Sequence, residues 1–101
     1  MNRQEYERRL DKSIYLKSRQ AWIEFIKRNS MFVKSSTYNS CYGLKQPLTR
    51  YTEKYLYALD MMELLRELGF TVKLESDGYP MAKTRLSKKF LKRVINREII
   101  K

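Results

Sequence analysis

The sequence contains no histidine, one cysteine, three glycines and two prolines. Without histidine, the commonest general base and a frequent metal ligand are missing. Cys41 alone forms neither an internal disulfide nor a zinc site of the CxxC type, and no histidine is present to activate it as a nucleophile. Phosphate-binding loops of the GxxxxGK[ST] or GxGxxG type are also absent. We therefore expect a non-enzymatic protein without cofactor or metal, in which Cys41 is a small, half-buried apolar side chain.

Long apolar runs are missing as well. No segment approaches the roughly 20 apolar residues that span a bilayer, and the N-terminal MNRQEYERRL lacks the apolar centre of a signal peptide. Together with the single cysteine, this predicts a cytoplasmic protein in a reducing compartment. The chain has 101 residues, of which 43% are hydrophobic and 13% aromatic, as is typical of one folded domain.

Acidic residues are scarce, with 11 Asp and Glu against 22 Lys and Arg, so the net charge is +11. Residues 1–34 carry nine basic and four acidic residues, residues 35–70 four and four, and residues 71–101 nine and three. All of the excess positive charge therefore lies in the two ends of the chain. Such a protein is expected to meet a polyanion: nucleic acid, an acidic protein surface or anionic lipid.

The first third of the chain, residues 1–34, has the pattern of one long helix. Asn2 and Glu5 form an N-terminal capping box, and the pattern predicts a helix from about residue 3 to about residue 28. We expect Trp22 and Phe25 in the core. The apolar stripe consists of Leu10, Ile14, Ala21, Trp22 and Phe25.

The middle third, residues 35–70, predicts a helix-turn-helix core. Pro47 is tolerated only in a first turn, so the first helix should begin between residues 43 and 46. A second helix, ALDMMELLREL, should bury its two methionines and end at Gly69, with Phe70 making the accompanying apolar contact. The segment EKYLY between them is ambiguous, because either a turn or one continuous helix over 47–68 fits it. Of the tyrosines in this block, we expect two or three to be at least half-buried; they are Tyr38, Tyr42, Tyr51, Tyr55 and Tyr57.

The last third changes period. Residues 71–86 alternate around the turn signal SDGY and predict a β-hairpin, and Ser87 caps a final helix over residues 88–101. The order helix, helix-turn-helix, hairpin and helix predicts an α+β fold that is mainly α: a winged helix in a single domain, with residues 71–86 as the wing. The apolar side of the last helix comprises Phe90, Leu91, Val94, Ile95 and Ile99.

The block STYNSCYGLKQPLTRYTEKYLYALDMMELLRELGFTVK resembles a segment of short accessory proteins of Gram-positive phages and mobile genetic elements. Those proteins carry a Tyr-Gly-Leu-Lys block, a spacer with tyrosine, and an apolar helix that ends in Gly-Phe before a hairpin. This sequence has Gln46 where a histidine is usual, and Pro47 is unusual there. The resemblance covers roughly 40 residues and implies a small DNA-binding protein of a mobile element that serves replication or regulation. The matching residues are Tyr42, Gly43, Leu44, Lys45, Tyr55, Gly69 and Phe70.

Two functional hypotheses remain open. The first is nucleic-acid binding, with DNA favoured over RNA, through backbone contacts and stacking on exposed single strands. Asp60, Glu63 and Glu67 make the second helix of the core a poor reader of the major groove. The second hypothesis is a protein-directed inhibitor or assembly factor that acts on a nucleic-acid enzyme such as a helicase, primase, polymerase or CRISPR effector, with the tyrosine-rich block as its contact surface. The predicted nucleic-acid-binding residues are Lys45, Arg50, Lys54, Tyr57, Lys73, Lys83, Arg85, Lys88, Lys89, Lys92 and Arg93.

Overall fold

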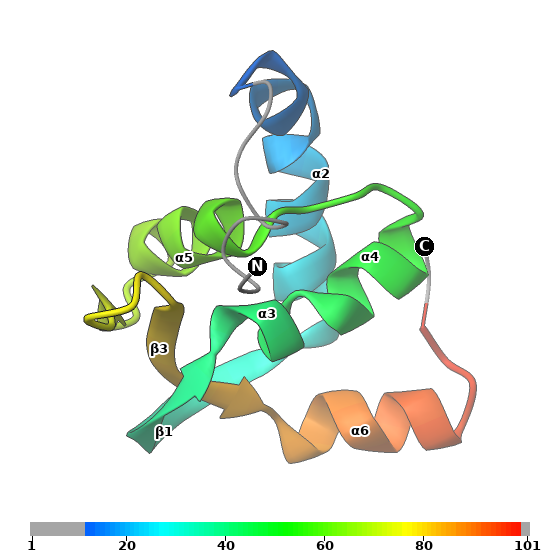
Figure 1. Cartoon of the computed structure of the whole chain (residues 1–101). Coiled ribbons are helices and arrows are strands. Elements are labelled where there is room, and N and C mark those ends of the chain that lie inside the picture. The colour runs from blue at the N-terminus through cyan, green and yellow to red at the C-terminus, as the bar shows by residue number, and fades with distance from the viewer. Residues whose placement is uncertain (1–11, 100–101) are drawn as a thin grey trace.

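A computed structural model describes residues 12–99 of the chain (Figure 1). It is an α+β fold, in which helices pack around a small antiparallel sheet, as the sequence predicts. The predicted capping box at Asn2 and Glu5, together with Leu10, lies outside the described residues. The elements are α2 (Lys12–Asn29), β1 (Phe32–Ser40), α3 (Cys41–Leu44), α4 (Gln46–Thr52), α5 (Ala58–Glu67), β2 (Val72–Leu74), β3 (Pro80–Leu86) and α6 (Lys88–Ile95).

The sheet has the strand order β1-β3-β2, and both pairings are antiparallel. The predicted hairpin is present as β2 and β3, with Val72 opposite Ala82, and residues 75–79 form its turn. Strand β1 pairs with the other edge of β3, with Phe32 opposite Leu86 and an irregularity in register between residues 34 and 39. A three-stranded sheet thus replaces the two-stranded wing that the sequence predicts.

Strand β1 is not predicted from the sequence and crosses the boundary at residue 34. The first helix is predicted to end near residue 28 and α2 ends at Asn29, but residues 32–40 then form one strand. Its partner β3 lies more than 40 residues further along the chain, and FVKSSTYNS has no apolar alternation to mark it as a strand. Two side-chain bonds add to the pairing: Asn39 Nδ2 donates to the Thr84 carbonyl at 2.8 Å, and Thr84 Oγ1 donates to the Val33 carbonyl at 2.7 Å.

Residues 46–67 form two helices, which resolves the ambiguity of the EKYLY segment. Helix α4 has Pro47 in its first turn, as predicted, and ends at Thr52, with Glu53 as its C-cap in the left-handed conformation with φ of 59°. A short helix, α3, precedes it, so the predicted first helix is divided in two. Helix α5 ends at Glu67, with Leu68 as its C-cap, and Gly69 follows with φ of 95°. The Phe70 amide bonds the Leu65 carbonyl and the Gly69 amide bonds the Arg66 carbonyl, which is the Schellman arrangement.

The core lies between one face of the sheet and the helices α2, α3, α4, α5 and α6, of which α3 and α5 pack directly on β3. Trp22 and Phe25 are buried as predicted, and so are Met61 and Met62. Cys41 is fully buried rather than half-buried. None of the helices within residues 12–99 has the length and apolar character needed to cross a membrane.

The last helix is shorter than predicted. Helix α6 begins at the predicted cap, Ser87, whose Oγ accepts from the Phe90 amide at 2.9 Å, and it ends at Ile95. Arg97 follows in the left-handed conformation with φ of 57°. Phe90 is buried, whereas Leu91 and Ile95 remain exposed. Only part of the predicted apolar side of this helix therefore reaches the core.

Candidate nucleic-acid interface

The outer face of the sheet gathers basic side chains. Along β3, Pro80, Ala82 and Thr84 are buried, so Met81, Lys83 and Arg85 point to the opposite face. Lys73 of β2 stands opposite Met81 and therefore shares that outer face. The alternation of two neighbouring strands thus places three predicted cations on one surface.

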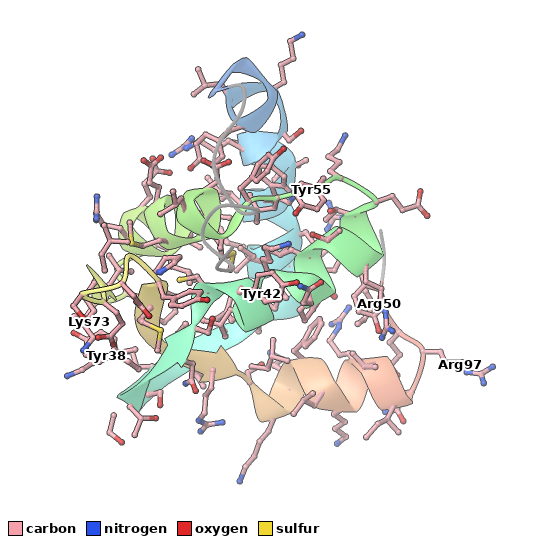
Figure 2. The ribbon with its side chains drawn as sticks, in the orientation of Figure 1. Tyr38, Tyr42, Arg50, Tyr55, Lys73 and Arg97 are labelled. Atoms are coloured by element: carbon pink, nitrogen blue, oxygen red, sulfur yellow. The ribbon has the colours of Figure 1, made fainter. Side chains whose placement is uncertain are left out.

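Tyr38 of β1 completes this cluster. Lys73 Nζ lies 4.2 Å and Lys83 Nζ 5.1 Å from the centroid of its ring, within the range of cation–π attraction. Figure 2 shows Tyr38 beside Lys73. Lys73 Nζ is also 3.2 Å from Glu75 Oε1, which offsets part of its charge. The half-buried ring therefore holds two ammonium groups from two different strands close together. We call Tyr38, Lys73, Lys83 and Arg85 the sheet-face cluster.

A recess of about 190 Å³ adjoins Lys83. The backbone amide of Lys83 donates to the Thr71 carbonyl at 2.8 Å, which keeps the start of β2 beside β3. Lys34 of β1 is exposed at the same recess, so two lysines from paired strands share it. Hydroxyl groups and positive charge together suit an anion. The recess is lined by Lys34, Ser35, Gly69, Phe70, Thr71 and Lys83.

Helix α6 continues the positive surface along the chain. Lys88, Lys89 and Lys92 are exposed, and no acidic residue occurs between Pro80 and Arg97. Arg93 is half-buried, and its Nη2 donates to the Glu98 carbonyl at 3.2 Å, so it is less available than the three lysines.

Other predicted residues lie away from the sheet-face cluster. Arg50 on α4 and Lys54 in the loop after it are both exposed, and Figure 2 places Arg50 on the side of the molecule opposite Tyr38 and Lys73. Tyr57, at the start of α5, is half-buried, with its ring centroid 4.8 Å from that of Tyr55 in an edge-to-face pair. Four of the five tyrosines of the middle block are at least half-buried, more than predicted; the exception is Tyr55, at 51% exposed.

The structure corrects the prediction that Lys45 is an accessible cation, because its side chain is buried, with 2% of its surface exposed. Its Nζ lies 4.5 Å from the ring centroid of Tyr55 and 5.2 Å from that of Tyr42. A lysine enclosed in this way does not reach a phosphate backbone. Instead, it joins the Tyr-Gly-Leu-Lys block to the segment before α5. The sequence marked it as a surface cation because a lysine in a polar helix is usually solvated.

Helix α5 presents little surface to a nucleic acid. Most of its residues are buried, including Asp60 at 3% exposed. Glu67 is bound by Arg19 of α2, whose Nη2 lies 2.6 Å from Glu67 Oε2, and this bond raises the pKa of the Arg19 guanidinium. Asp60 therefore lies inside the protein, and Glu67 is paired with Arg19 at the surface, so neither is an unpaired outward-facing carboxylate.

Two residues of the interface escaped the sequence analysis. Both belong to β1: Tyr38 lies on the face of Lys73 and Lys83, whereas Lys34 stands opposite Thr84 and joins Lys83 only at the recess, so neither could be placed without recognising that strand. At the hairpin turn, Glu75 and Asp77 add negative charge, so the tip of the hairpin is less suited to phosphate than its base. Within residues 12–99, no three Cys, Asp or Glu side chains gather as a metal site would need.

Comparisons with protein-family models, with curated proteins and with solved structures gave no significant match to this chain.

Proposed function

We propose that this chain is a small nucleic-acid-binding accessory protein of winged-helix type that binds DNA mainly through its phosphate backbone, with single strands preferred. The order of α2, β1, the α3–α4 pair, α5 and the β2–β3 hairpin, with β1 paired to β3, supports the winged-helix assignment. A role in replication or regulation of a phage or mobile element follows from the resemblance of the Tyr-Gly-Leu-Lys block and belongs to the same proposal.

The observation that carries the proposal is the position of Tyr38 beside Lys73 and Lys83 on the outer face of the sheet. Phosphates neutralised by lysines release counterions, which gives an affinity that falls steeply with salt. An aromatic ring among those lysines adds a surface on which an unpaired base can stack, a contact worth about 1–3 kcal/mol per base. A duplex does not offer its bases in this way, which is why single strands are preferred.

The burial and the acidic residues of α5 also favour binding through the phosphate backbone over the reading of base edges. In helix-turn-helix proteins the second helix reads base edges in the major groove. Here most side chains of that helix are buried in the core, and Arg66 is its one basic residue. Sequence-specific reading of a duplex is therefore not part of the proposal, and the binding surface consists of the sheet-face cluster, Lys34 and the lysines of α6.

Fluorescence anisotropy with labelled single- and double-stranded oligonucleotides of one sequence tests the proposal. At low salt we expect binding to both, tighter for the single strand, with a log–log salt slope of about −0.7 per phosphate contacted. Tyr38→Leu should reduce the preference for the single strand, while Tyr38→Phe keeps it, because only leucine lacks an aromatic face. Absence of binding to either oligonucleotide at low salt would overturn the proposal.

A further inference from the structure

A second surface, distinct from the sheet face, lies between α4 and α6. A groove of about 490 Å³ separates the two helices, which run one above the other in Figure 1. Its volume is within the range of sites that hold small ligands or the side chains of a peptide. The lining is largely apolar and consists of Gln46, Pro47, Thr49, Arg50, Tyr51, Leu86, Phe90, Leu91 and Val94.

The floor of this groove is part of the folded core. Tyr51 stacks on Phe25 with centroids 6.2 Å apart and meets Phe90 edge-on at 6.1 Å. Because Tyr51 and Phe90 are held by these ring contacts, the groove has a rigid base. A preformed base lowers the cost of ordering on binding.

Leu91, which lines the groove, and Ile95, one turn further along α6, are large exposed apolar side chains. Leu91 is 44% exposed and Ile95 is 79% exposed, although both belong to a helix whose Phe90 is 1% exposed. Leu91 and Ile95 are four residues apart and therefore lie on one face of α6. Adjacent exposed apolar side chains beside an apolar groove are typical of a site of protein interaction.

The charges around the groove have one sign. Neither α4 nor α6 contains an acidic residue, and Arg50 lines the groove itself. Lys88 and Lys92 share the helix face of Leu91 and Ile95 by their spacing, and both are exposed. The acidic residues nearest in sequence, Glu53 and Glu98, lie just beyond the ends of the two helices. The occupant should therefore combine apolar side chains with negative charge.

We propose that the α4–α6 groove binds a short acidic segment of a protein partner that carries bulky apolar residues. The apolar residues would enter the groove beside Leu91, and the carboxylates would meet Arg50, Lys88 and Lys92. A second copy of the chain does not fit, because its corresponding surface repeats the same positive charge and each copy has a net charge of +11. Nucleic acid fits poorly, because phosphates gain nothing from the apolar lining.

Fluorescence anisotropy with the full chain and three synthetic probes tests this inference. The first probe is a labelled peptide that alternates Asp or Glu with Leu and Phe at helical spacing. The second replaces its Leu and Phe with Ser at equal charge, and the third is an oligonucleotide competitor. We expect the first peptide to bind with a Kd of about 10–100 μM. The serine peptide should bind at least about tenfold more weakly, because burial of apolar side chains should supply the larger share of the binding free energy.

Paired substitutions locate the site. Leu91→Gln with Ile95→Gln should weaken binding of the first peptide about tenfold. Leu74→Gln is the matched control: Leu74 of β2 is an apolar side chain 54% exposed outside the groove, and its loss should leave the affinity unchanged. Arg50→Glu should weaken binding as well, whereas Lys17→Glu on α2 should affect it less. Chemical-shift changes in the unsubstituted protein should cluster on α4 and α6.

Three outcomes would overturn the inference. Equal binding of the serine peptide would mean that charge alone attracts the probe. Shifts confined to the sheet face would place the peptide elsewhere. Complete displacement by the oligonucleotide, with shared shifts at Tyr51 and Phe90 on the floor of the groove, would assign the groove to nucleic acid. This inference stands without the proposed function, because its probe contains no nucleic acid and its variants leave the sheet-face cluster intact.

Discussion

The hydroxyl of Ser87 joins the beginning of α6 to the end of α2, because Ser87 Oγ donates to the Ser30 carbonyl and accepts from the Phe90 amide. The Ser87 amide donates in turn to the Met31 carbonyl at 2.8 Å. Ser87 is 3% exposed. A residue that the sequence marks only as a local helix cap thus also connects two segments more than 50 residues apart.

Ser87→Ala should therefore lower the free energy of unfolding by about 1–3 kcal/mol, since the substitution removes a helix cap and leaves the part-buried Ser30 carbonyl without its donor. Urea denaturation monitored by circular dichroism measures the change. Ser36→Ala, at an exposed position of β1, is the control and should stay within about 0.5 kcal/mol of the unsubstituted protein. Equal midpoints for the two variants would contradict the role of Ser87.

Gly69 and Gly43 form a second matched pair. A Cβ at either position meets no atom within 4 Å, so sterics with neighbours do not distinguish them, but Gly69 has φ of 95° and Gly43 lies in helix α3. Gly69→Ala should destabilise the fold by about 1–2 kcal/mol through backbone strain. Gly43→Ala should be neutral or stabilise by up to about 1 kcal/mol. Thermal denaturation of both variants tests this, and a reversed order would refute the backbone explanation.

Stability should fall in alkaline solution. Burial raises the pKa of the Cys41 thiol from 9.0 to about 12, and burial, with Glu67 and Glu63, raises the pKa of Tyr15 from 10.0 to about 12. Between these values the unfolded chain has lost protons that the folded chain keeps. The contribution of these two groups to the free energy of unfolding is therefore complete below about pH 9. It declines as the pH approaches 12, by up to about 1.4 kcal/mol per pH unit for each group.

Urea midpoints measured from neutral pH upward test this dependence. Cys41→Ala should be less stable than the unsubstituted protein at neutral pH because it opens a small cavity. Its decline with pH should nevertheless be shallower above pH 9, because one titrating group is gone. In the folded protein the thiol should not react with Ellman's reagent, and it should react fully in urea. Parallel pH profiles for the two proteins would contradict the burial of Cys41.

Substitutions on the sheet face should affect nucleic-acid binding more than equal changes of charge elsewhere on the basic surface. Lys83→Gln with Arg85→Gln should make the salt slope shallower by about 1.4, equivalent to two phosphate contacts on a single strand. Lys27→Gln with Arg28→Gln removes the same charge from exposed positions near the end of α2 and should change the slope little. Oligonucleotide anisotropy over a salt series measures both. If both pairs of substitutions changed the salt slope equally, binding would depend on net charge alone and not on the sheet face.

The features that the sequence predicts correctly are those encoded by neighbouring residues. Pro47 marks a first helical turn, Gly69 a helix end and Ser87 a cap, because each depends on a backbone conformation that one residue type favours. The sequence does not settle the division of residues 46–67 into two helices, because Glu53 in the left-handed conformation is not marked by glycine.

The candidate site is predictable from the sequence only in part, because some of its residues meet only through contacts between distant segments of the chain. Lys73, Lys83 and Arg85 could be assigned to one hairpin from their alternation, but Tyr38 and Lys34 reach them only through the pairing of β1 with β3. Lys45 was misplaced because its burial depends on rings at Tyr42 and Tyr55, on two different segments.

The sequence by itself determined the helices, the hairpin and the excess of positive charge, since helical periodicity, turn residues and composition act over a few residues. Only the tertiary structure decided which charges share a surface: β1 as a third strand, Lys45 inside, Tyr38 between two lysines, and an open groove beside Leu91 and Ile95. Those arrangements depend on contacts between residues distant in the chain, and their free energy is gained only when the whole core closes.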